Sequence, residues 1–151
     1  MYEFVDRPVD SLCNSGRFLL WAMRGWTRAA ERGHCPPRAI AGSFAGMGVL
    51  TALPDFHMTM VLINRDSLEK IAIAPLEYPG IVEHEAVLIS LWRDCANADA
   101  DRARATLAFL VDEDTVGPIS GAMTAAAAGL VAAGFDLSEL TAQPVKEIGI
   151  K

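Results

Sequence analysis

The sequence predicts a single all-α domain over residues 1–151, built as a bundle of about six helices. Apolar residues recur three and four positions apart along most of the chain, and glycines or prolines separate these stretches by short loops. A chain of 151 residues can also bury roughly 70% of the surface that its unfolded form exposes, so it needs no disulfide or metal to fold. We expect the core to span about residues 12–135.

The first helix is expected over residues 15–32, with Asn14 or Ser15 as its N-cap and Gly33 as its stop. One side of this helix is apolar and carries Leu19, Ala22, Met23, Trp26, Ala29 and Ala30. The other side carries Arg17, Trp21, Arg24, Arg28 and Glu31. A tryptophan therefore interrupts an arginine stripe that should face water.

A second helix should begin at Pro36-Pro37 and end at Pro54, followed by a shorter third helix over residues 55–66. Three glycines lie inside the second helix, at Gly42, Gly46 and Gly48. Each costs about 1 kcal/mol relative to alanine in a helix interior. We interpret them as a site of close helix packing, with the alanine-rich sixth helix as the expected neighbour. A bound molecule is the alternative.

The run 71–74 is β-prone and precedes Pro75, so it is either a short strand or an extended connector. A lone strand cannot form a sheet within one chain, so it would have to pair with a copy of itself or with another short segment.

A fourth helix is expected from Ile81, with Glu83 and Glu85 in its first turn, where the helix dipole favours acids. Its predicted core face carries His84, Val87, Leu88, Leu91 and Cys95.

A fifth helix should follow an N-cap at Asn97 or Asp99 and stop before the acidic triplet 112–114, because acids are unfavourable at the negative end of the dipole. Pro118 is expected to open the sixth helix, which ends at Gly134. Residues 136–151 are predicted to form a short turn of helix and a loose tail.

Residues 115–135 carry no charged side chain, which suggests a membrane span. A spanning helix needs about 20 mainly apolar residues and usually shows flanking positive charge. This stretch is rich in alanine and glycine and contains Pro118 and two threonines, and its flanks are Asp114 and Asp136. We therefore expect a buried helix and no membrane association.

Charge is distributed unevenly along the chain. Residues 1–38 carry a net charge of +2 and the remainder −8, for a total of −6. Nucleic-acid binding requires a positive face, and only the first helix offers one, so we expect no nucleic-acid partner. Three widely spaced cysteines argue against a disulfide framework, and early acidic residues argue against a signal peptide, so we expect a cytoplasmic protein.

The chain contains none of the glycine-rich nucleotide-binding motifs and no nucleophile elbow. His34 and Cys35 are adjacent, whereas paired zinc ligands usually lie two to four residues apart, so we expect no metal and no cofactor. Glu83, His84 and Glu85 cannot converge on one atom, because successive side chains of a helix point about 100° apart. Of the three, only His84 should face the core.

The succession of helices resembles a family of short bacterial all-helical proteins of unknown function. The resemblance is carried by the arginine-containing first helix, the glycine-bearing second helix, the 71–75 connector and the acidic start at Glu83-His84-Glu85. It covers about residues 15–135. At His84 the family typically has an acidic residue. The resemblance implies the helical fold and no activity.

Trp21 carries our first functional hypothesis. A tryptophan among Arg17, Arg24 and Arg28 has two explanations. It is held in place by cation–π stacking on these arginines alone, or it anchors a contact with another protein. We favour the protein contact, because Trp and Arg are enriched at interface hot spots. The chain would then be a non-enzymatic helical protein that self-associates, as a homodimer, or binds a protein partner. The contact would use the Trp21 face or the 71–74 edge.

The alternative is a small-molecule-binding protein or an enzyme. Its pocket would lie between the second and sixth helices, with polar groups that converge on a ligand. The residues expected to line it are Gly42, Gly46, His57, His84 and Glu85.

Overall fold

A computed structural model describes residues 2–142, and in this part of the chain the all-α prediction is confirmed. The six α-helices are α1 (Asn14–Glu31), α2 (Pro36–Gly46), α3 (Leu53–Asp66), α4 (Glu83–Ala96), α5 (Ala100–Leu110) and α6 (Glu113–Ala132). Two short 3-10 helices accompany them, η1 (Val9–Ser11) and η2 (Leu50–Ala52). Within residues 2–142 there are isolated β-bridges but no strand.

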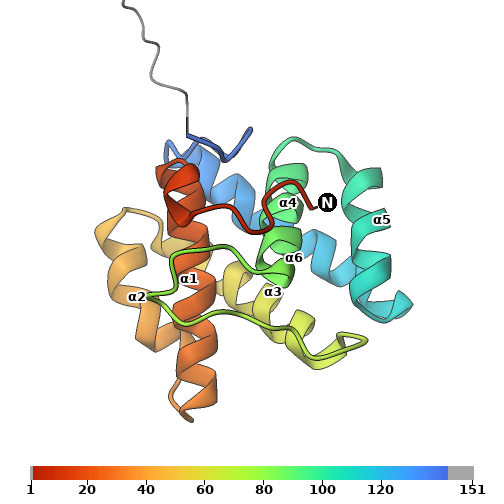
Figure 1. The fold of residues 1–151 in the computed structure, drawn as a ribbon, viewed down its shortest axis with the longest axis horizontal. Coiled ribbons are helices and arrows are strands. Elements are labelled where there is room, and N and C mark those ends of the chain that lie inside the picture. Colours follow the sequence, from red (N-terminus) through yellow and green to blue (C-terminus); the bar gives the residue numbers. More distant parts are fainter. Residues whose placement is uncertain (1, 143–151) are drawn as a thin grey trace, which may run out of the picture.

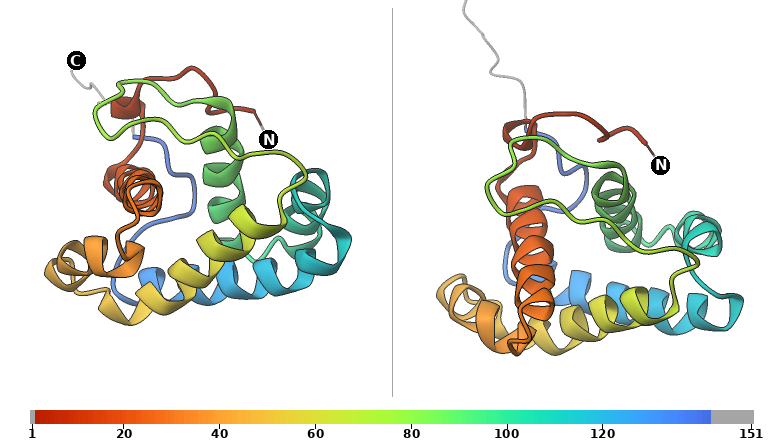
Figure 2. Two further views of the ribbon diagram at one scale, coloured as in Figure 1. Left: turned by 90° about the horizontal axis from the view of Figure 1, so that it is seen from below. Right: turned by 60° about the horizontal axis from the view of Figure 1, so that its bottom comes forward.

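The helices are arranged in two layers. In Figure 2, α3 and α6 run side by side as one layer, and α1 and α4 lie across it. The helices α2 and α5 lie at opposite ends of the molecule (Figure 1). Two segments, residues 2–12 and 67–82, pass over α1 and α4 on the side away from α3 and α6. The interior enclosed by the helices and these two segments holds Phe4, Phe44, Phe56 and Trp92, each almost fully buried.

The boundary between α2 and α3 differs from the prediction. The helix α2 starts at Pro36, as expected, but ends at Gly46 instead of continuing to Pro54. Gly48 adopts φ +74°, a left-handed conformation that stops a helix and that glycine tolerates. The chain then forms η2, and α3 begins at Leu53 with Pro54 in its first turn, where a missing N–H costs nothing.

The predicted close packing at the glycines of α2 is wrong. Gly42 and Gly46 are exposed, and a Cβ added at either would meet no atom within 4 Å. The helix α2 packs against α1 and α3, whereas α6 packs against α3, α4, α5 and η2. The close approach that involves α6 is at Gly129, where an added Cβ would lie 3.3 Å from Cβ of Ala52 in η2.

The acidic triplet 112–114 begins α6, although the sequence predicted that it would only end α5. The helix α5 ends at Leu110, and Asp99 is its N-cap, accepting a hydrogen bond from the Arg102 N–H at 3.3 Å. The helix α6 starts at Glu113, so Glu113 and Asp114 occupy its first turn, where the dipole favours acids. Pro118 consequently lies inside α6 and does not open it.

The helix α6 is long and apolar enough to cross a membrane by length and composition alone. A core helix of a globular fold meets the same criterion. Seven residues of α6 are buried, among them Ile119, Met123 and Leu130, and the helix packs against α3, α4 and α5. In this structure α6 is therefore part of the core.

The chain after α6 contradicts the predicted turn of helix. Residues 135–142 contain no helix and bury Leu137 and Leu140. The Leu140 carbonyl accepts a hydrogen bond from the Cys13 N–H at 3.1 Å, and a Cβ added at Gly16 would lie only 2.9 Å from the same oxygen. With Phe4 also buried, the core extends beyond residues 12–135 at both ends. The rest of the predicted tail, residues 143–151, lies outside the described residues.

The 71–74 run is an extended connector and not a strand. Its amides pair with side chains of α4. The Ala72 N–H donates to His84 Nδ1 at 2.7 Å, and the Ala74 N–H donates to Glu85 Oε2 at 3.0 Å. Because alternate residues of an extended chain share one side, both amides reach the first turn of α4.

Candidate functional site

Trp21 lies at the outer end of a row of aromatic rings. Its ring stacks on Phe18, one turn earlier in α1, with the two centroids 6.2 Å apart. Phe18 contacts Phe44 of α2 at 5.0 Å, Phe44 contacts Phe56 of α3 at 5.5 Å, and Phe56 stacks on Trp92 of α4 at 5.6 Å. The surface tryptophan, 37% exposed, thus rests on the partly buried Phe18, and behind Phe18 lie buried rings of α2, α3 and α4.

Two hollows adjoin Trp21 on the surface where α1 meets α2, and we call them together the Trp21 groove. The larger, of about 610 Å³, is shallow, open to solvent and mainly apolar, and is lined by Phe18, Trp21 and Met47 together with Asn14, Arg17, Ser43 and Gly46. The smaller, of about 220 Å³, lies toward the C-terminal end of α1. Its lining includes Trp21, Ala29, Ile40 and Leu76, with Arg28, Arg32 and His34.

The floor of the groove is set by a close contact between α1 and α2. Gly25 faces Ile40, and an added Cβ would lie 3.1 Å from Ile40 Cγ2. An alanine at position 25 would require the Ile40 side chain to move by a few tenths of an ångström. Trp21 and Met47, 37% and 52% exposed, line the same hollow.

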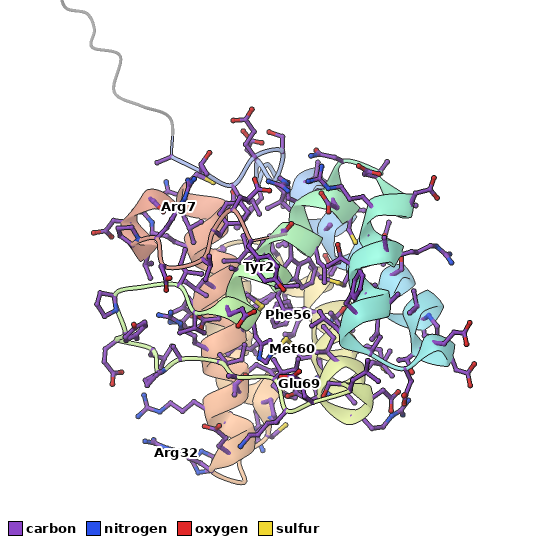
Figure 3. The ribbon with its side chains drawn as sticks, turned by 45° about the vertical axis from the view of Figure 1, so that its right-hand side comes forward. Tyr2, Arg7, Arg32, Phe56, Met60 and Glu69 are labelled. Carbon is purple, nitrogen blue, oxygen red and sulfur yellow. The ribbon has the colours of Figure 1, made fainter. Side chains whose placement is uncertain are left out.

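The charged side chains of the groove are all positive. Arg17, Arg28 and Arg32 are exposed and line the hollows, and no Asp or Glu of residues 2–142 lines either one. An adjoining hollow outside the groove shares Arg28 and Arg32 and also contains Glu31 and Glu77. Arg17 donates a hydrogen bond to the Asn14 side chain, and none of the three arginines forms an ion pair within the described chain. Figure 3 shows Arg32 at the end of α1, pointing away from the interior that holds Phe56 and Met60.

Arg24 does not belong to this surface, which corrects the predicted arginine stripe. It is 3% exposed, and its guanidinium is bound on all sides. It donates to Glu85 Oε2 at 2.8 Å and Oε1 at 2.9 Å, and to the carbonyls of Tyr78 at 2.7 Å and Gly80 at 2.6 Å. The physical reason is the 67–82 connector, which covers the edge of α1 on which Arg24 lies.

The start of α4 also differs from the prediction that only His84 faces the core. Glu85 is fully buried, whereas the His84 side chain is 17% exposed. Glu85 accepts two hydrogen bonds from Arg24 and one each from the N–H groups of Ala74 and Val82. Both side chains are therefore occupied in holding the connector to α4.

The five residues predicted to line a pocket do not come together. His84 and Glu85 bind the connector, and His57 of α3 accepts a hydrogen bond from Trp26 Nε1 at 2.9 Å. Gly42 is exposed on α2. Gly46 lines the larger hollow of the Trp21 groove, beside Arg17 and Trp21 of the predicted interface.

The His57 contact predicts a pH dependence of stability. Burial lowers the pKa of His57 below its usual value, so the fold favours the neutral ring, whose Nδ1 accepts the Trp26 hydrogen bond. The unfolded chain binds the proton more readily, and the free energy of unfolding should therefore fall as the pH drops through about 6.5 and below. Denaturant titrations from pH 7.5 to 5 measure this loss.

His57→Asn supplies the matched variant, because an asparagine oxygen can accept the same hydrogen bond without titrating. The loss of stability between pH 7.5 and 5 should be smaller in His57→Asn than in the original chain. His34→Asn, at an exposed histidine, should leave the loss unchanged. Equal pH dependence in all three proteins would contradict the assignment.

Metal and cysteine chemistry receive no support from the described residues. Within residues 2–142, no three His, Cys, Asp or Glu side chains are grouped so that they could hold a metal ion. Cys13, Cys35 and Cys95 are free, and burial raises the pKa of the Cys95 thiol, which disfavours the reactive thiolate.

The sequence identified Arg17, Trp21 and Arg28, which line the groove from α1, but it missed the residues that line the groove opposite α1. Ile40 of α2, Met47 just after α2 and Leu76 of the connector complete it. The sequence offered no signal for Met47, because the predicted second helix continued to Pro54, whereas α2 ends at Gly46 and leaves Met47 exposed.

The chain matches no protein-family model, no curated protein and no solved structure.

Proposed function

We propose that this chain is a non-enzymatic binding module that contacts another polypeptide through the Trp21 groove. The observation that carries the proposal is the half-exposed Trp21, supported from below by Phe18 and flanked by two hollows. Interface hot spots are typically aromatic or arginine side chains set in such surroundings. A preformed groove with an aromatic anchor offers a partner apolar contact without reorganisation of this chain.

The titratable groups support binding over catalysis. Glu85 is saturated by four hydrogen bonds, His84 accepts one from a backbone amide, and His57 holds Trp26. A general acid or base must be free to reach a substrate proton. These three side chains instead stabilise the fold.

A second copy of the chain is the occupant expected from the sequence, and the groove is the better of the two surfaces proposed for it. The 71–74 edge already uses the amides of Ala72 and Ala74 in hydrogen bonds to α4. Pairing with a strand on that side would require these bonds to break. A homodimer would accordingly meet across the Trp21 groove.

The proposal predicts site-specific crosslinking from the groove. A photoreactive residue in place of Met47, introduced in the cells that make the protein, should crosslink to a polypeptide. Trp21→Ala in the same protein should lower the yield at least about tenfold, because truncating a hot-spot side chain costs at least about 2 kcal/mol of binding. Mass spectrometry identifies the product, and twice the mass of the chain would indicate a homodimer.

Met58 provides the control position, since it is exposed to a similar degree, 48% against 52% for Met47, but lies on α3 outside the groove. A crosslinker at Met58 should give no Trp21-dependent product. Equal products from both positions, or a Met47 product that is insensitive to Trp21→Ala, would refute the proposed site.

A further inference from the structure

The charges of the Trp21 groove point to the kind of polypeptide that occupies it. We infer that the occupant is an acidic amphipathic helix of a different protein, which lies along α1 with its apolar side chains in the two hollows. This inference rests on the proposed function and narrows it to one class of partner. Docking of such a helix into an apolar groove is a common mode of peptide recognition.

The electrostatic contrast between the groove and the rest of the chain carries the inference. The whole chain has a net charge of −6, yet the groove is lined by Arg17, Arg28 and Arg32 and by no acidic residue of the described chain. Outside the groove, exposed Arg65 pairs with Asp66 at 2.8 Å, whereas exposed Arg7, Arg38 and Arg104 form no ion pair within the described residues. The three groove arginines differ from these in lining apolar hollows, where a partner's acids can reach them, and interface charges of opposite sign steer association and set its specificity.

The dimensions of the groove suit a helix. The larger hollow begins at Asn14 and Arg17, and the smaller reaches Arg28 and Arg32, with Trp21 bordering both. Eleven residues separate Arg17 from Arg28, which at about 1.5 Å per residue places them roughly 16 Å apart along α1. Three turns of a docked helix cover that distance. Its apolar residues would recur three and four positions apart, with acids on both flanks.

A symmetric dimer fits these charges poorly. In a two-fold contact the same patch lies on both subunits, so the three arginines of one copy would face those of the other. Neither hollow of the groove contains a carboxylate; Glu31 and Glu77 lie in the adjoining hollow that shares Arg28 and Arg32. Like charges placed together across an interface disfavour it. An acidic partner removes this repulsion and gains ion pairs instead.

The test uses three synthetic 18-residue peptides with the same apolar stripe and with Glu, Gln or Lys at the flanking positions. Fluorescence anisotropy with the full chain should show that the Glu peptide binds at least about tenfold more tightly than the Gln peptide and that the Lys peptide binds most weakly. Raising the salt concentration should weaken binding of the Glu peptide selectively, since salt screens exposed charges.

Two triple variants change the net charge of the chain by the same amount. Comparing them separates the effect of the groove arginines from the effect of the net charge of the whole chain. Arg17→Glu/Arg28→Glu/Arg32→Glu should reverse the preference in favour of the Lys peptide. Arg7→Glu/Lys70→Glu/Arg104→Glu, at exposed positions that do not line the groove, should retain the preference for the Glu peptide. Circular dichroism verifies that both variants keep their helix content.

Three outcomes would overturn the inference. Equal binding of all three peptides that Trp21→Ala abolishes would show that the groove binds polypeptides without selecting charge, and the proposed function would stand. No peptide binding together with a dimer that Trp21→Ala dissociates would identify a second copy as the occupant, and again only the inference would fail. No peptide binding and no Trp21-dependent crosslink would refute both.

Discussion

Replacing Glu85 by alanine is expected to lower the free energy of unfolding by about 3–5 kcal/mol, because it leaves the Arg24 guanidinium buried without a counter-charge. The two side chains are 0% and 2% exposed and meet in a bidentate ion pair, with Nε to Oε2 at 2.8 Å and Nη2 to Oε1 at 2.9 Å. Denaturant unfolding monitored by circular dichroism measures the loss.

The expected loss includes more than the ion pair. Glu85 also accepts from the amides of Ala74 and Val82, so the variant leaves these donors without their partner. Hydrogen exchange should therefore show faster exchange at the Ala74 amide, in the connector, even under conditions where the helices remain protected. This local signature separates a released connector from a general loss of stability.

Two controls test the interpretation. Glu83→Ala, at an exposed position in the first turn of the same helix, should change stability by no more than about 1 kcal/mol, since only a contribution from the helix dipole is lost. Arg24→Met/Glu85→Leu removes both charges, and buried pairs replaced by apolar residues are often neutral or stabilising. A double variant as unstable as Glu85→Ala would show that the hydrogen bonds to the connector, rather than the uncompensated charge, dominate.

Helical periodicity predicted the six helices well because it is a local property of the chain. The bounds of α1, expected at 15–32, are Asn14–Glu31, and Gly33 follows with φ +73°. Asp99 caps α5, one of the two residues proposed for that role. Each of these features depends on residues within one or two turns, which a single sequence displays directly.

The errors lie where a distant segment covers a helix. By spacing, Arg24 belongs with Arg17 and Arg28 on the exposed side of α1, but a connector more than forty residues away in sequence and Glu85 of α4 bury it. Its partner Glu85 was mispredicted for the same reason. Residues 135–142 are a third case, because the space beside Gly16 that receives them is formed by the N-terminal end of α1.

The site was half predictable on similar grounds. Trp21 stood out because it broke an amphipathic pattern within one helix, and that signal is local. The opposite wall of the groove depends on how α2 packs at Gly25, and the sequence instead suggested that α2 packs against α6. A pattern within one helix identifies an unusual residue, whereas a binding surface requires the pairing of two helices.

Truncating Phe44 to alanine is the second substitution with a large expected effect. Phe44 is 1% exposed and contacts both Phe18 and Phe56, so it joins the surface end of the aromatic row to its buried end. Phenylalanine-to-alanine changes in a core cost about 3–5 kcal/mol through lost burial and the cavity left behind. Denaturant unfolding should show a loss of this size.

The same substitution should alter the Trp21 groove, because Phe18 rests on Phe44 and Trp21 rests on Phe18. Trp26 and Trp92 are 6% and 0% exposed, so quenching of tryptophan fluorescence by acrylamide reports mainly on Trp21. Quenching should increase in Phe44→Ala at denaturant concentrations where the protein is still folded, and binding of the Glu peptide should weaken.

Phe44→Leu is the matched control, since leucine retains much of the volume and a conservative apolar change usually costs less than about 1.5 kcal/mol. It should leave both quenching and peptide binding close to those of the original chain. If Phe44→Ala lost stability while Trp21 quenching and peptide binding stayed unchanged, the groove would not depend on the aromatic row for its shape. If all three change together, the buried rings hold the surface tryptophan in the position from which it meets a partner.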